Sequence, residues 1–150
     1  MTTNPALDDA ARLVGDWQMD LYNAGFLPEP ESRVAGSAKI DWVEGGSALV
    51  IRQGNWAHPP AAAWIIGRDE GEPDYVVLYA DDRGVSRIYR MTLEGTHWEI
   101  WRESPEFTQR FSAEIDPDGQ VIRGRWEKSS DRGTTWEHDF NLDYVRSVRS

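Results

Sequence analysis

The stretch RIYRMTLEGTHWEIWR, residues 87–102, decides the fold, because it reads as two short strands joined by a tight turn. Aromatic and β-branched residues recur on both sides of a Glu-Gly pair at 94–95, which is typical of a β-hairpin. Side chains in a strand alternate between two faces, so a two-residue turn over 94–95 places Met91 opposite Trp98 on one face. That face is apolar and the other carries charges, so we expect one side of a sheet to be buried.

The same hairpin makes two further predictions at its open end. Arg87 lies opposite Arg102 on the inner face, and Ile88 lies beside Trp101 on the outer face. Like charges directly opposite each other in a ladder are destabilising. Either both arginines are solvated or paired with acids at a rim, or an anionic ligand lies between them.

Everything after Gly15 reads as strands separated by turn signals about every ten residues. The expected strands are 16–22, 35–44, 47–56, 62–69, 74–81, 85–93, 96–104, 107–116, 119–128 and 134–146. Short connections make neighbouring strands antiparallel, and so long a meander closes into a barrel. We therefore expect an all-β fold, an antiparallel up-and-down barrel of about ten strands that forms one domain over residues 1–150.

Two segments fall outside this strand pattern. Asn4 or Asp8 caps an expected short helix, whose apolar residues recur at helical spacing. The segment NAGFLPEPESR, residues 23–33, is the longest loop-like stretch before the sheet, and we expect it to cover one end of the barrel.

Carrying the registers around the sheet places Trp64 opposite Tyr79, Tyr79 opposite Arg87, and Arg102 opposite Gln109. The inward residues then stack into layers, which are apolar at one end and aromatic and polar at the other. Such a gradient is expected of a small barrel that is closed at its base and open at its mouth. The aromatic side chains either fill the barrel or grip a ligand. The candidate ligand-binding residues are Trp64, Tyr79, Arg87, Tyr89, Arg102, Gln109, Phe111, Trp126, Trp136 and His138.

His138 falls on the inner face opposite Gly124, which leaves room beside it. It is either a core histidine hydrogen-bonded to Tyr89 or a backbone group, or a residue that contacts a ligand. No HxH, HExxH, GxSxG or GxGxxG motif occurs in the chain, so no catalytic or metal-binding residue is predicted.

Composition excludes several classes of protein. The 150 residues contain no cysteine and carry a formal net charge of −10, which excludes disulfides and argues against nucleic-acid binding. No signal peptide and no run of eighteen apolar residues is present, so no membrane span is expected. We expect a cytoplasmic protein.

The two ends of the chain carry a family resemblance. Gly15-Asp16-Trp17 resembles the Gly-x-Trp that opens the first strand of lipocalin-like, or calycin, barrels. Arg146 has the inward parity of Leu142, where that family has an arginine packed across the first-strand tryptophan. The resemblance therefore implies a structural contact between Trp17 and Arg146, and a cation over an indole is a favourable contact.

The chain is most similar to small bacterial lipocalin-like proteins of unassigned function, and more distantly to nitrobindin-like and fatty-acid-binding-protein-like barrels. Nitrobindins hold haem through a histidine on a late strand, which implies His138 as a haem ligand. Their glycine-rich opening, with Gly-x-Gly before Tyr-Pro, is absent, because this chain reads GDWQMDLYNAGFLPEP.

We therefore expect a binding protein that encloses a small, largely apolar or amphipathic ligand, with an anionic group such as a carboxylate near Arg87 and Arg102. The alternatives are an enzyme that uses His138 as acid and base in the same cavity, or a haem-binding barrel. No other cofactor is predicted. Ile88 and Trp101 form a candidate surface for a homodimer.

Overall fold

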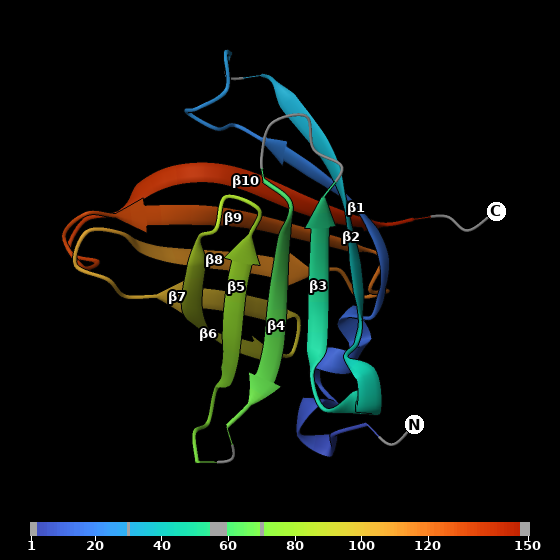
Figure 1. Cartoon of the computed structure of the whole chain (residues 1–150). Coiled ribbons are helices and arrows are strands. Elements are labelled where there is room, and N and C mark those ends of the chain that lie inside the picture. The colour runs from blue at the N-terminus through green and yellow to red at the C-terminus, as the bar shows by residue number, and fades with distance from the viewer. Residues whose placement is uncertain (1–2, 30, 55–59, 70, 148–150) are drawn as a thin grey trace.

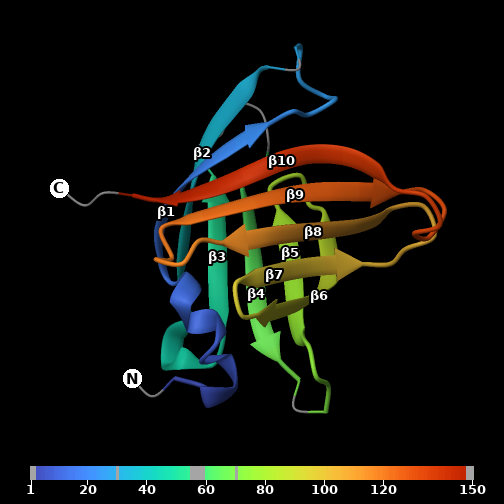
Figure 2. The same ribbon diagram turned by 180° about the vertical axis from the view of Figure 1, so that it is seen from behind.

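The computed structural model of the chain describes residues 3–29, 31–54, 60–69 and 71–147. Ten antiparallel strands form one closed barrel in which each strand pairs with its neighbours in sequence, and β10 closes the ring against β1 (Figures 1 and 2). The strands are β1 (Gly15–Tyr22), β2 (Arg33–Trp42), β3 (Leu49–Gly54), β4 (Ala62–Arg68), β5 (Tyr75–Asp81), β6 (Ser86–Glu94), β7 (His97–Arg102), β8 (Thr108–Ile115), β9 (Val121–Ser129) and β10 (Glu137–Arg146). The expected all-β, ten-stranded barrel is thus confirmed. The last two residues of the strand expected at 47–56 lie outside the described residues.

The up-and-down order gives the barrel two different ends. The connections β2–β3, β4–β5, β6–β7 and β8–β9 lie at one end, together with the N-terminal segment. At the other end, which we call the mouth, strands β1, β3, β5, β7 and β9 end and strands β2, β4, β6, β8 and β10 begin. In Figure 1 the N-terminal segment lies below the sheet, beside the β2–β3 connection. A backbone hydrogen bond of 2.8 Å from Asn4 to Gly46 joins these two segments.

The N-terminal segment differs from the expected single helix. It forms two short 3₁₀-helices, η1 (Pro5–Leu7) and η2 (Ala10–Leu13), and the Asn4 side chain caps the first. The buried residues Leu7, Ala10 and Leu13 recur every third position, which matches the three residues per turn of a 3₁₀-helix. A third 3₁₀-helix, η3 (Glu44–Gly46), lies in the β2–β3 connection. Among the helices that the structure describes, none is long and apolar enough to cross a membrane.

Three predicted registers are confirmed. Trp64 pairs with Tyr79, Tyr79 pairs with Arg87, and Arg102 pairs with Gln109. The inward face of strands β4 to β8 is therefore the predicted one.

The predicted turn of the β6–β7 hairpin is wrong by one position. Glu94 pairs with His97, so Gly95 and Thr96 form the turn. Gly95 has a φ of +59°, a left-handed conformation that glycine adopts without strain, and it therefore takes the first turn position. The register shifts by two residues, which keeps every side chain on its face but moves Arg87 away from the position opposite Arg102.

The outer face of the same hairpin changes accordingly. Trp101 lies opposite Arg90 and not beside Ile88. Ile88 instead aligns with Leu78, which aligns with Ile65, so these three side chains form an exposed apolar row across β4, β5 and β6.

A single arginine joins the first and last strands at the closed end. Arg146 pairs with Trp17, and its Cζ lies 4.2 Å from the centre of the indole rings. Its guanidinium donates hydrogen bonds to the carbonyl oxygens of Arg12 (2.7 Å), Val14 (2.8 Å) and Gly119 (2.9 Å). The cation therefore connects the N-terminal segment, β1 and the β8–β9 turn around one buried tryptophan.

Replacing Arg146 by alanine should lower the free energy of unfolding by about 2–4 kcal/mol, because three carbonyl oxygens lose a charged donor and Trp17 loses its cation. Urea unfolding followed by tryptophan fluorescence measures this change. The control is Arg125→Ala, which removes an exposed guanidinium 3.9 Å from Glu127 and should change stability by about 0.5 kcal/mol or less. Equal effects of the two substitutions would contradict the assigned role of Arg146.

Candidate functional site

The barrel contains a cavity of about 600 Å³ that opens at the mouth. It is lined mainly by aromatic and aliphatic side chains that point inward from the strands. Seven of the ten predicted site residues line it: Trp64, Tyr79, Arg87, Tyr89, Gln109, Phe111 and Trp126.

Aromatic rings in mutual contact form one wall of the cavity. The Trp64 ring centre lies 4.5 Å from that of Tyr79, 5.2 Å from that of Tyr89 and 5.8 Å from that of Trp126. Phe111 contacts Trp126 at 5.3 Å. Rings held by several neighbours present a rigid apolar surface, which suits the flat or elongated body of a small molecule.

The β1–β2 loop contributes to the mouth, as predicted for residues 23–33; residue 30 lies outside the described residues. Phe26, Leu27 and Pro28 all line the cavity. The Phe26 ring is 59% exposed and contacts the Phe140 ring edge-on at 5.8 Å. An aromatic side chain thus stands where a molecule would enter.

Arg87 projects from β6 into the same cavity. Its Cζ lies 5.0 Å from the centre of the Phe107 ring and 5.9 Å from that of the Tyr79 ring. Among the described residues, no carboxylate lies within 4 Å of the Arg87 guanidinium. The aromatic contacts hold this cation in place, while its N–H groups have no anionic partner in the part of the chain that the structure describes.

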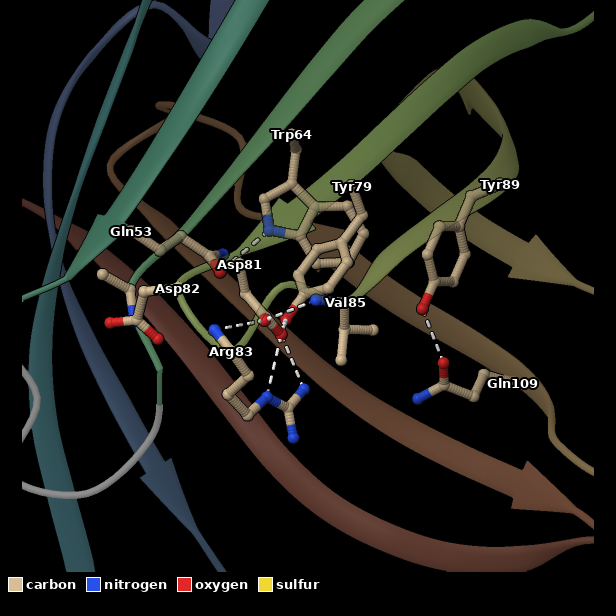
Figure 3. Close-up of polar contacts among 10 residues, drawn as sticks. Gln53, Trp64, Tyr79, Asp81, Asp82, Arg83, Val85, Tyr89 and Gln109 are labelled. Atoms are coloured by element: carbon tan, nitrogen blue, oxygen red, sulfur yellow. Dashed lines mark hydrogen bonds and ion pairs between the residues drawn. The ribbon is translucent and has the colours of Figure 1, made fainter.

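Asp81 neutralises the second arginine of the mouth. Its carboxylate accepts hydrogen bonds from the Tyr79 hydroxyl (2.6 Å) and from Arg83 Nη2 (2.6 Å) and Nε (3.1 Å) (Figure 3). The Arg83 hydrogen bonds and the Tyr79 hydroxyl hold the pKa of Asp81 well below its usual range, although burial opposes them. The Arg83 charge is therefore paired, and Arg87 carries the unpaired positive charge of the cavity.

Tyr89 and Gln109 form a buried pair next to this cation. The Tyr89 hydroxyl donates to Gln109 Oε1 at 2.5 Å (Figure 3), and Gln109 is 7% exposed. Burial raises the pKa of Tyr89, and the charges of Arg87 and Arg102 oppose this rise. Because Oε1 accepts from the tyrosine, the Gln109 amide N–H groups remain as donors in the cavity that Arg87 also lines.

The sequence interpretation missed Gln53 and Tyr144, which join two inner walls. Gln53 Nε2 donates to the Tyr144 hydroxyl at 3.0 Å, and its Oε1 accepts from Trp64 Nε1 at 2.9 Å. Both residues line the cavity. The alternation itself indicates them, since Gln53 has the inward parity of Ile51 and Tyr144 that of Leu142.

A β-bulge in β10 overturns the predicted position of His138. Phe140 pairs with Trp126 but His138 pairs with Glu127, so Asp139 is an extra residue in the strand. The extra residue reverses the alternation: Asp139 lines the cavity, and His138 lies exposed outside it. Burial raises the pKa of the Asp139 carboxyl, offset in part by the charges of Lys128 and His138.

His138 Nε2 lies 3.2 Å from the carbonyl oxygen of Asn23, to which it can donate, so it interacts with the β1–β2 connection and not with Tyr89. Among the described residues that line the cavity, none is a histidine. The cavity enzyme and the haem site that relied on His138 therefore lose their central residue. His58 lies outside the described residues.

Two other predicted site residues lie away from the cavity. Trp136 precedes the first residue of β10, and the Cζ of Arg110 lies 3.9 Å from the centre of its ring. Arg102 lines a separate groove together with Trp136, although its Cζ is 5.9 Å from the centre of the Tyr89 ring. β10 begins at Glu137 and not at residue 134, so Trp136 lies in the β9–β10 connection. The shifted β6–β7 register removes Arg87 from the position opposite Arg102.

Comparison with known proteins gives a likeness in structure alone. Neither a protein-family model nor a curated protein matches the sequence. Among solved structures, the chain is similar to Rv2717c from M. tuberculosis, with a TM-score of 0.67 and 13% identical residues over 98% of this chain and 100% of that one. At this identity the likeness supports the barrel fold and says nothing of a ligand.

Replacing Gly124 by alanine should destabilise the protein by about 1–3 kcal/mol, because the new Cβ would lie 2.4 Å from Cε1 of Phe111 and would push that ring within the cavity. The space that the sequence assigned to His138 is thus filled by Phe111. Urea unfolding measures the loss, with Gly67→Ala as the control, whose Cβ would meet Val76 at an ordinary 3.9 Å. A Gly124→Ala protein as stable as the control would contradict this packing.

Proposed function

We propose that the protein binds a small, largely apolar organic anion inside the barrel. The observation that carries this proposal is Arg87, a cation on the wall of an aromatic cavity with no carboxylate within 4 Å among the described residues. A guanidinium that loses water without gaining an anionic partner is unfavourable. A ligand carboxylate, sulfonate or phosphate would supply the missing partner through charge-assisted hydrogen bonds.

Gln109 supports an anion at this position. Its amide N–H groups are donors in the cavity that Arg87 also lines, because its oxygen already accepts from Tyr89. A planar carboxylate has two oxygens, so one can accept from Arg87 and the other from Gln109. Phosphate is less favoured, since Arg87 is the one unpaired cation among the described residues that line the cavity.

The remaining lining favours an apolar body on that anion. Trp64, Trp126 and Phe111 present ring surfaces to the cavity. A volume of about 600 Å³ falls in the range of about 300–1,000 Å³ that is usual for small-molecule sites. Aromatic or alicyclic acids fit these walls, as do fatty acids.

Binding is better supported than catalysis. Among the described lining residues there is no hydrogen-bonded pair of a nucleophile and a base, and the charged partner of Asp139 is Lys128, at 3.9 Å. A lipocalin-like assignment is part of the same proposal: it is supported by the closed ten-stranded barrel and by the Arg146 contact with Trp17.

The aromatic anion 8-anilinonaphthalene-1-sulfonate should bind and quench the intrinsic tryptophan fluorescence, because Trp64 and Trp126 line the cavity. Arg87→Ala should raise its dissociation constant about tenfold or more, since a charge-assisted contact is lost. The control is Arg90→Ala on the same strand, whose side chain faces outward towards Glu72, and its dissociation constant should stay within about twofold of the wild type. Equal binding by both variants would refute an anion site at Arg87.

Binding of the same sulfonate should strengthen as the pH falls through the raised pKa of Asp139. Protonation removes the negative charge of that carboxyl from the cavity, while the sulfonate remains ionised. The affinity should therefore fall as the pH rises, until Asp139 is fully ionised. Asp139→Asn should bind more tightly at neutral pH and lose this dependence; a pH profile that is unchanged in the variant would exclude Asp139 as its source.

A further inference from the structure

We infer that the Tyr144 hydroxyl is a second recognition point at the floor of the cavity, and that the ligand carries a neutral hydrogen-bond acceptor, such as a carbonyl or ether oxygen, at the end away from its anion. This inference rests on the proposed function and adds a second requirement to it. The three groups that carry it are Trp64, Gln53 and Tyr144.

Trp64 fixes the orientation of the Gln53 amide. An indole N–H can only donate a hydrogen bond, so the atom 2.9 Å from Trp64 Nε1 must be the amide oxygen (Figure 3). The amide nitrogen is then the atom 3.0 Å from the Tyr144 oxygen. Gln53 therefore donates to Tyr144 and cannot accept from it.

The direction of this bond leaves the Tyr144 proton without an acceptor. The tyrosine oxygen receives a hydrogen bond from Gln53, and no second hydrogen bond of this hydroxyl occurs within the part of the chain that the structure describes. Tyr144 is 3% exposed and lines the cavity. Burial also raises its pKa, so the hydroxyl keeps its proton at any physiological pH. It is thus a permanent donor that faces the cavity.

The surroundings of Tyr144 favour a neutral acceptor. Its ring contacts Trp98 at 5.8 Å and Trp17 at 6.3 Å, two buried residues towards the closed end. The cation at that end, Arg146, already donates to three backbone carbonyls and stacks on Trp17. A second anion would find no free positive charge there, whereas a carbonyl or ether oxygen needs only the hydroxyl proton.

The two polar points therefore differ in chemistry. Arg87 and Gln109 take the anion, and Tyr144 takes an uncharged acceptor beyond the aromatic walls. A ligand that ends in a plain hydrocarbon, such as a saturated fatty acid, would leave the Tyr144 donor unpaired. The site should accordingly prefer keto, ester or ether acids to hydrocarbon acids of the same shape.

A matched pair of acids tests this preference. In 4′-acetylbiphenyl-4-carboxylate a carbonyl stands opposite the carboxylate, and in 4′-isopropylbiphenyl-4-carboxylate a methyl group replaces that oxygen. Isothermal titration calorimetry on the wild-type protein should show that the acetyl compound binds about three- to tenfold more tightly than the isopropyl compound. Tyr144→Phe should abolish the preference by weakening the acetyl compound alone, with circular dichroism confirming that the variant is folded.

Gln53→Glu separates the direction of the hydrogen bond from the presence of the hydroxyl. A carboxylate at position 53 accepts from Trp64 and also from the Tyr144 O–H, so the hydroxyl no longer donates to a ligand. The acetyl and isopropyl compounds should then bind about equally tightly, although Tyr144 is retained. The added negative charge weakens the binding of both compounds alike and does not alter the ratio of their dissociation constants.

The outcomes distinguish this inference from the proposed function. If both acids bind and Arg87→Ala weakens both, but their ratio is near one or is unchanged by Tyr144→Phe, the floor site is wrong and the anion site stands. If neither acid binds to the wild type, both proposals fall. A preference that survives Gln53→Glu would also overturn the assigned direction of the hydrogen bond.

Discussion

Closing ten strands into a ring is the constraint on which the rest of this structure depends. Every second residue must enter one shared interior, and no edge remains where a strand can slip without changing its neighbours on both sides. A register shift of two residues between neighbouring strands leaves the same side chains in the interior. One extra residue within a strand instead exchanges the inward and outward side chains that follow it. The first rule preserves the aromatic walls of the cavity. The second, through the bulge at Asp139, supplies the one carboxylic acid among the described residues that line it.

These two rules also explain which features of the fold and of the cavity could be predicted from the sequence. The face of Trp64, Tyr79 and Arg87 was predictable because it depends only on alternation. The exact partner across a ladder was not, since the Gly95 turn moves the register by two without any trace in the hydrophobic pattern. The bulge could not be predicted, because an extra residue in the polar stretch from Glu137 to Asp139 disturbs no apolar periodicity. For this reason the predicted inward position of His138 was wrong.

Inside the cavity, the chemical character follows from side chains that can act in one direction only. The Trp64 indole donates and never accepts, so it fixes the orientation of the Gln53 amide. The Gln53 oxygen accepts from the indole, and its amide nitrogen donates to Tyr144. The Gln109 oxygen accepts from Tyr89, so its N–H groups remain available in the cavity. A largely apolar interior thereby acquires a definite polarity, rich in donors and poor in acceptors.

The pairing of the first strand with the last has a consequence for the order of events in the cell. Trp17 can meet Arg146 only after β10 has been synthesised, and closing so long a loop carries an entropic cost that slows folding. While the C-terminal strand is still held in the ribosome, β1 lacks its partner and the ring is open. The closed interior therefore forms only after all ten strands that surround it have been synthesised.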